Sequence, residues 1–144
     1  MKGLINRMRD LFSRQSVSAV EDSPSIMFCA RNVTKGNVIA QRVRWAGTST
    51  ERRRGLLDHE SLDVNEGMYI VPTQWIHMFG MRFSIDVAFI ASDGRVLHIE
   101  RALKPNRFSR LVLRAEGALE FAAGVLASSN TTVGDTIELV ESSN

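Results

Sequence analysis

The residues of this chain that are best suited to chemistry fall in a predicted β-hairpin, residues 81–103. Asp86 lies on its first strand, while His98 and Glu100 lie on its second. Two carboxylates and an imidazole are side chains that hold metals or exchange protons in acid–base catalysis. The same residues suit the wet face of an antiparallel sheet, with Arg82 and His98 as counter-charges. We favour the wet face and keep a metal-dependent or hydrolytic enzyme as the alternative.

The register of the hairpin decides which of these side chains meet. Odd positions from 81 to 89 are all apolar, which predicts a half-buried strand with its odd face toward the core. A two-residue turn would pair Phe89 with His98. A three-residue turn with Gly94 in the left-handed conformation pairs Phe89 with Leu97, so that apolar side chains match. We expect the three-residue turn, which also sets the two carboxylates of the hairpin opposite each other.

A second group of candidates precedes the hairpin, in residues 75–81. This segment combines aromatic, His and Met side chains. Met and His are ligands for Cu(I), but Met also fills irregular apolar gaps, and we favour an apolar pocket without a metal or cofactor. The candidate ligand-binding residues of the whole chain are therefore Trp75, His77, Arg82, Asp86, His98, Glu100 and Glu120.

Basic residues concentrate in two segments. Residues 101–114 contain Arg and Lys side chains around Phe108 and no acid, while residues 1–15 combine basic residues with apolar residues at helical spacing. Such segments bind anionic lipid or single-stranded nucleic acid. Charged strand edges that oppose aggregation have the same composition. A binder of anionic surfaces is thus a further alternative, although nucleic acid is not favoured because no nucleic-acid-binding motif is present.

The composition is that of one ordinary globular domain. The chain has 144 residues, 44% hydrophobic and 24% charged, with a net charge of +2. A single cysteine, Cys29, excludes an intrachain disulfide framework and a Cys-rich zinc site. No uncharged stretch reaches the ~20 residues of a membrane-spanning helix. Charged residues interrupt the N-terminal apolar positions, so we expect no secretory signal and a cytoplasmic location.

Strand signals outnumber helix signals along the chain, which predicts a mainly β fold. We expect an antiparallel β-sandwich or partly closed barrel with one or two short helices, one of them at residues 52–57 with its N-cap among residues 48–51. The predicted strands are residues 26–33, 38–46, 67–71, 81–90 and 95–103, with weaker ones at 111–113, 118–121 and 136–140.

The chain divides into an N-terminal segment and one domain. Residues 1–20 form a basic amphipathic segment, residues 21–25 a linker, and residues 26–144 the β domain. The N-terminal helix would dock on the domain, on another copy or on a membrane surface, and we expect it to be dispensable for folding.

Several short motifs occur in a characteristic order and spacing: Arg54-Gly55-Leu56-Leu57, Met78-Phe79-Gly80-Met81-Arg82, Ile85-Asp86-Val87-Ala88-Phe89-Ile90 and Asp93-Gly94-Arg95-Val96. Over roughly residues 35–140 the chain resembles the DUF192 family, small bacterial and archaeal domains of unknown function. The resemblance implies a mainly β domain with no established catalytic activity. It also implies a buried structural role for Asp86, with Arg82 or a backbone N–H as its partner. The matching positions are Gly55, Gly67, Met81, Asp86, Gly94, Glu120, Gly124 and Asp135.

We therefore expect a protein of unknown function that most resembles a non-catalytic small-ligand-binding or accessory module. Its partner would be a small molecule or another protein. The enzyme and the binder of anionic surfaces remain the alternatives.

Overall fold

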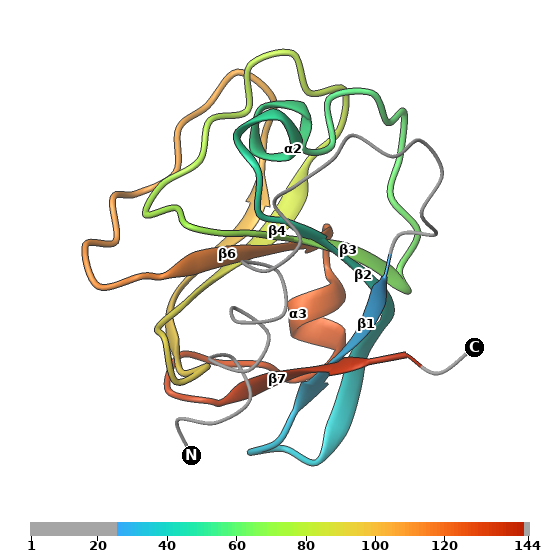
Figure 1. Ribbon diagram of the computed structural model, residues 1–144, viewed down its shortest axis with the longest axis vertical. Helices are drawn as coiled ribbons and strands as arrows, with labels where there is room; N and C mark the ends of the chain where they lie inside the picture. The colour runs from blue at the N-terminus through green and yellow to red at the C-terminus, as the bar shows by residue number, and fades with distance from the viewer. Residues whose placement is uncertain (1–25, 143–144) are drawn as a thin grey trace.

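A computed structural model of the protein describes residues 26–142 (Figure 1). The predicted N-terminal segment and linker, residues 1–25, lie outside the described residues, and so do residues 143 and 144. None of the described helices is long and apolar enough to cross a membrane.

The described part of the chain forms one curled sheet with two short helices. The sheet has seven strands in the order β5-β4-β6-β3-β2-β1-β7. In chain order the elements are β1 (Met27–Asn32), β2 (Asn37–Ala46), α2 (Ser49–Arg54), β3 (Glu66–Ile70), β4 (Ile85–Ile90), β5 (Val96–Leu103), β6 (Gly117–Ala122), α3 (Val125–Ser128) and β7 (Ile137–Glu141).

The sheet curls into a half-barrel (Figure 1). The two outer strands of the sheet, β5 and β7, approach each other at an isolated β-bridge between Arg95 and Thr136. Next to this bridge, Val96 N donates a hydrogen bond to Asp135 O at 2.8 Å. The mainly β prediction and the partly closed barrel are confirmed. The sheet is mainly antiparallel, as expected, with one exception: β2 and β3 are parallel, because the connection through α2 crosses over before the chain re-enters the sheet.

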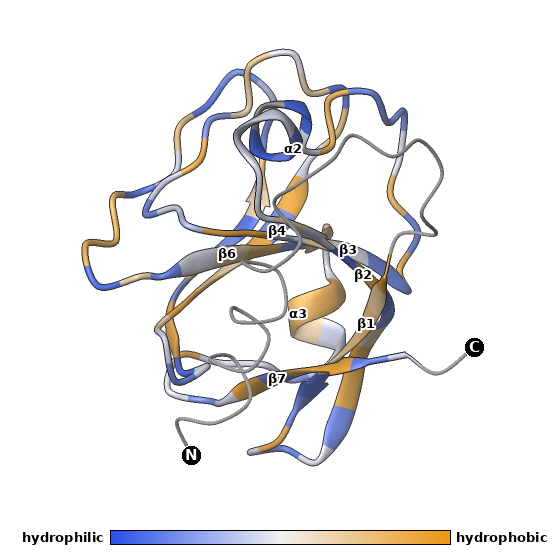
Figure 2. Cartoon of the chain, in the orientation of Figure 1, coloured by the Kyte–Doolittle hydropathy of each residue, from blue (hydrophilic) through white to orange (hydrophobic). Residues whose placement is uncertain are grey.

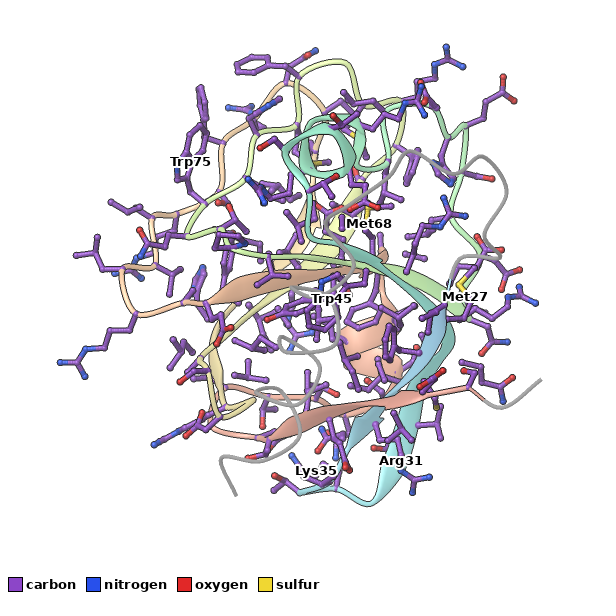
Figure 3. All side chains as sticks on the ribbon, viewed as in Figure 1. Met27, Arg31, Lys35, Trp45, Met68 and Trp75 are labelled. Carbon is purple, nitrogen blue, oxygen red and sulfur yellow. The ribbon has the colours of Figure 1, made fainter. Side chains whose placement is uncertain are left out.

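The sheet has an apolar core on each face. Inside the curl, Trp45, Tyr69 and Phe121 pack against Leu126 of α3. On the outer face, Met68 and Phe89 belong to a second core. Figure 3 shows Trp45 within the curl and Met68 on the side of the sheet that α2 covers. The sheet is thus buried on both faces where β4 and β6 run, and every residue of these two strands is buried.

The two helices meet these cores differently (Figure 2). α3 carries Val125 and Leu126 into the inner core. α2 consists of polar residues only, and the buried Leu56 follows it. The N-cap of α2 is Thr48 with Glu51 in a capping box, so the predicted N-cap is confirmed, although the helix begins and ends about three residues before residues 52–57.

The predicted hairpin register was wrong. The turn itself is as expected, since Gly94 has a φ of +88° and Ala91 N donates to Arg95 O at 2.9 Å. Ile90 still pairs with Val96, but the register then shifts, so that Phe89 lies opposite His98 and Val87 opposite Glu100. This leaves Leu97 as an extra residue in β5, where it packs against the outer core. Apolar matching did not decide the register because the bulge lets Leu97 pack against the outer core without lying opposite Phe89.

Two strand predictions were also wrong in extent. The strand predicted to begin at residue 81 begins at Ile85 and is buried on both faces rather than half-buried. Residues 111–113 form no strand. The other predicted strands agree with the observed ones to within one or two residues.

A polar cluster joins the β1–β2 turn to the loop before β7. Asp135 accepts hydrogen bonds from Asn32 Nδ2, Lys35 Nζ and Thr132 N, each at 3.0 Å. Burial alone would raise the pKa of Asp135, but these hydrogen bonds and the Lys35 charge outweigh it and lower the pKa to about 2. The ionised carboxylate therefore ties the first hairpin to the last strand of the sheet.

Candidate functional site

A pocket of about 370 Å³ lies on the outer face of the sheet, between α2 and the segment that follows β3. Its apolar lining consists of Leu56, Leu57, Ile70, Pro72, Ile76, Met78 and Met81, and its polar lining of Ser49, Arg52, Arg54, Thr73, His77 and Glu120, with Trp75 and Gly55 completing it. The volume falls in the range of small-molecule sites.

One wall of the pocket is an extended segment, residues 74–78, that runs antiparallel to residues 106–112. Met78 N donates to Arg107 O at 2.8 Å and Ser109 N donates to Ile76 O at 2.9 Å. Successive side chains of an extended segment point to opposite sides. Ile76 and Met78 are accordingly buried, whereas Trp75 and His77 are exposed at the rim.

The other wall is formed by the end of α2. Gly55 follows the helix with a φ of +45°, which suits glycine. The chain then presents Leu56 and Leu57 to the pocket. A Cβ on Gly80 would lie 3.3 Å from Leu57, so the two walls approach each other closely at this glycine. The glycines of two short motifs thus permit the turn after α2 and the close approach of Leu57 to residue 80.

Glu120 lies on β6 at the sheet side of the pocket, between Met68 of β3 and Val87 of β4. The residue is only 5% exposed. Among the groups that the structure describes, none donates a hydrogen bond to its carboxyl group or pairs with its charge. Burial raises the pKa of Glu120 to about 8. A carboxyl group without a counter-charge in an apolar site is mainly protonated at neutral pH and both donates and accepts hydrogen bonds.

Three of the predicted site residues therefore meet. Trp75, His77 and Glu120 all line this pocket. Arg82 does not join them: it is exposed and its Nη1 lies 3.3 Å from Glu60 Oε1.

Asp86 lies on the opposite face of the sheet from Glu120, because neighbouring strand residues alternate and Asp86 is paired with Phe121. It is 1% exposed. Its carboxylate accepts hydrogen bonds from Ala102 N at 2.9 Å, Gly124 N at 3.0 Å and Leu126 N at 3.1 Å. The buried structural role is confirmed with backbone N–H groups as partners, and Arg82 is not one of them.

His98 and Glu100 form a pair of their own on β5. His98 Nε2 lies 3.1 Å from Glu100 Oε1, and the same oxygen accepts from Arg110 N at 2.9 Å. Glu100 and Glu120 are both paired with Val87, from opposite sides, so about two strand spacings, roughly 10 Å, separate their backbones. Within residues 26–142 no group of three His, Cys, Asp or Glu side chains is arranged to hold a metal.

The α2 side of the pocket is absent from our sequence-based site. Arg52, Gly55, Leu56 and Leu57 line it, although they belong to or adjoin one of the motifs that carry the family resemblance. That motif was the available signal. Spacing alone could not identify it, because more than sixty residues separate it from Glu120 along the chain.

Comparison with known proteins identifies the family. The chain is 37% identical to a UPF0127 protein of Thermococcus sibiricus over 113 residues, which are 74% of this chain and 71% of that protein. It is 31% identical to a UPF0127 protein of Pyrococcus furiosus over 112 residues, which are 74% of this chain and 94% of that protein.

Two solved structures share the fold. One is a protein of unknown function from Novosphingobium aromaticivorans, with a TM-score of 0.70 and 24% identity over 88% of this chain and 96% of that one. The other is a putative transcription regulator from Sinorhizobium meliloti, with a TM-score of 0.68 and 22% identity over 84% of this chain and 98% of that one. The family model DUF192, described as "Uncharacterized ACR", matches residues 30–139. The chain therefore belongs to the DUF192 family.

Proposed function

We propose that this domain is a non-catalytic small-ligand-binding module and that the pocket at Glu120 is its binding site. The observation that carries the proposal is the Glu120 carboxyl group, which is buried in a pocket lined by both apolar and polar side chains and has no described partner. A buried polar group without a hydrogen bond destabilises the free protein, and a ligand that pairs with it removes this cost. Titratable groups with a perturbed pKa that lie in a cleft are frequent at functional sites.

The lining favours a ligand with an apolar body and one basic nitrogen. Leu57, Ile70 and Met81 would contact the body. An ammonium group would supply both the hydrogen-bond donors and the positive charge that Glu120 lacks. The nearby Arg side chains are otherwise engaged: Arg52 Nη1 donates to Gly47 O at 2.7 Å, and Arg54 pairs with Asp58 at 3.5 Å.

An enzyme that uses the carboxylates and His98 finds less support. A general base and its partner need to lie about 3 Å apart or to be linked by one water. Asp86 uses both carboxylate oxygens on backbone N–H groups, and the His98–Glu100 pair lies on the far side of Val87 from Glu120.

Titration of the full chain with hexylamine at pH 7 tests the proposal. The hexylammonium ion should saturate a site with NMR shifts at Leu57, Ile70, Met81 and Glu120. Binding should also release close to one proton, because the ion pair lowers the pKa of a carboxyl group that is mainly protonated when free. Calorimetry in two buffers of different ionisation enthalpy measures that proton. Hexanol and hexanoate, which have the same chain length, should bind more weakly.

Two variants act as controls for this titration. Glu120→Gln should abolish both the preference for hexylamine and the proton release, whereas Glu100→Gln should retain them. Equal binding of all three hexyl compounds, or shifts that avoid the pocket, would contradict the proposal.

The cytoplasmic location belongs to the same proposal. It is supported by a lone cysteine, Cys29, which suits a reducing compartment and carries no disulfide. Fractionation of cells that express the full chain tests it, and recovery of the protein outside the cytoplasm would contradict it.

A further inference from the structure

A strip of aromatic side chains lies exposed beside the pocket. Trp75, His77 and Phe79 alternate with buried residues along one extended segment, and Phe108 comes from the neighbouring one. Their rings contact each other: Phe79 and Phe108 have centroids 5.0 Å apart, and Trp75 and Phe108 5.8 Å apart. Figure 3 shows Trp75 projecting away from the sheet at the edge of the molecule. The strip is therefore one continuous apolar surface.

The segment that contributes Phe108 carries two further exposed apolar side chains, Leu111 and Leu113. Leu111 is 55% exposed, Leu113 is 71% exposed and Phe108 is 60% exposed. The backbones stay together over this stretch, since Val112 N donates to Gln74 O and Gln74 Nε2 donates to Leu113 O, each at 2.8 Å. Large apolar side chains gathered in this way on a protein surface mark an interaction site.

Basic residues surround the apolar surface. Lys104, Arg107, Arg110 and Arg114 are exposed, and residues 101–115 contain no acid. We call the apolar strip together with these four basic residues the aromatic–basic patch. The positive charge of the patch favours an anionic partner, and its exposed apolar side chains favour a partner that also offers an apolar surface.

We propose that the aromatic–basic patch docks on anionic lipid bilayers. Trp, Phe and Leu side chains enter the boundary between headgroups and acyl chains, while Arg and Lys side chains attract anionic headgroups. The basic residues lie on the segment that also carries Phe108, Leu111 and Leu113, so a bilayer that this segment faces contacts both kinds of side chain. This proposal stands apart from the pocket, although Trp75 and His77 border both surfaces.

Two other occupants fit less well. Bases of single-stranded nucleic acid stack on free aromatic faces. Here the rings pack against each other at angles of 46° and 82°, and the aliphatic Leu111 and Leu113 offer no ring at all. A second copy of the chain would pair the patch with itself across a two-fold axis, which brings its cations together.

Vesicle binding by the full chain tests the proposal. The probe is vesicles of phosphatidylcholine that contain about one quarter phosphatidylserine, because anionic headgroups create the attracting potential. A brominated phosphatidylcholine in the same vesicles quenches tryptophan fluorescence. The chain has two tryptophans, of which Trp75 is exposed and Trp45 buried. We expect binding to quench the Trp75 fluorescence, to weaken as salt is raised and to be much weaker with phosphatidylcholine alone.

Matched variants identify the surface that binds. Two variants should each lower the partition coefficient at least about tenfold. Arg107→Gln/Arg110→Gln/Arg114→Gln removes three charges, and one basic residue near the surface contributes about fivefold. Leu111→Ser/Leu113→Ser removes apolar area that would enter the bilayer. Val64→Ser/Val133→Ser removes exposed apolar side chains elsewhere, and Arg31→Gln/Arg44→Gln/Arg95→Gln removes the same charge elsewhere. These controls should bind within about twofold of the unsubstituted chain, and melting curves of all variants verify folding.

Several outcomes would overturn the proposal. One is vesicle binding that the patch variants retain, which would assign it to another part of the chain. Another is an equal loss of vesicle binding in the patch variants and in the control variants. Binding of an oligothymidylate but not of vesicles would assign the patch to nucleic acid, and a dimer in sedimentation without vesicle binding would assign it to a second copy.

Discussion

Asp86, Glu120 and Asp135 are buried carboxyl groups that differ in what surrounds them. Asp86 accepts three backbone N–H groups, and Asp135 accepts Asn32, Lys35 and a backbone N–H. Glu120 has no such partner among the described residues, and burial raises its pKa to about 8. The first two tie parts of the fold together through these hydrogen bonds, whereas Glu120 is left to respond to pH and to a ligand.

The raised pKa of Glu120 predicts a stability that falls as pH increases. Between the ordinary value of 4.5 and the folded value of about 8, the folded state holds a proton that the unfolded chain has lost. This contribution to stability is therefore full below pH 4.5 and declines by about 1.4 kcal/mol per pH unit until pH reaches about 8. Urea unfolding of the full chain at several pH values measures the slope.

Glu120→Gln isolates this effect because the amide is nearly the same size and does not titrate. The difference in unfolding free energy between the variant and the unsubstituted chain should grow in favour of the variant from pH 5 to pH 8. A difference that stays constant over this range would mean that Glu120 ionises normally.

Asp86 should be indispensable for stability. Asp86→Ala leaves the N–H groups of Ala102, Gly124 and Leu126 without their acceptor, which costs about 1–3 kcal/mol. Asp86→Asn retains one acceptor oxygen, so its stability should fall between those of Asp86→Ala and the unsubstituted chain. Arg82→Ala, on the exposed polar position four residues earlier, should change stability by less than about 0.5 kcal/mol. Melting curves of Asp86→Ala and Asp86→Asn that match the unsubstituted chain would return Asp86 to the candidate ligand residues.

At the scale of elements, the β4–β5 hairpin illustrates how glycine and bulges set a register. Gly94 holds the turn with a positive φ, and β5 then accommodates extra residues near Leu97 and Ala102. At the second of these, Asp86 Oδ1 accepts from Ala102 N, and Ala102 itself has a φ of +48°. The buried carboxylate of β4 therefore stabilises the irregular backbone of its neighbouring strand.

Gly94→Ala should destabilise the domain more than Gly36→Ala. Both glycines have a positive φ, +88° and +75°, so both substitutions incur backbone strain of about 1–2 kcal/mol. A Cβ on Gly94 would also collide with the carbonyl oxygen of Ile137, whereas the space around Gly36 is open. Chemical unfolding of the two variants measures the difference in stability. Equal losses of stability would show that the backbone of β7 moves away from residue 94 without a cost in free energy.

For the whole molecule, the double-sided burial of the sheet explains where the pocket lies. α3 fills the inner face of the curl, while the outer face is covered by polar α2 and two long loops. Loops leave gaps more readily than a packed sheet or helix, and such coverings are where binding sites concentrate. The pocket and the aromatic–basic patch both belong to this outer covering.

The sequence by itself determined the mainly β class, most of the strands, the capped start of α2, the left-handed Gly94 and the family. These features are local: alternation, a capping residue or a glycine in a turn acts within a few residues of the chain. The family resemblance also indicated the buried role of Asp86, since its motif carries information that spacing lacks.

Only the tertiary structure decided the hairpin register, the separation of Asp86 from Glu120 and the burial of Glu120 beside Trp75 and His77. Alternation along a strand identifies its buried face only when the other face is wet. β4 and β6 have a core on each side, so their polar residues gave no indication of whether they meet solvent, backbone N–H groups or a pocket. That outcome depends on which elements cover each face, and those elements lie far away in the chain.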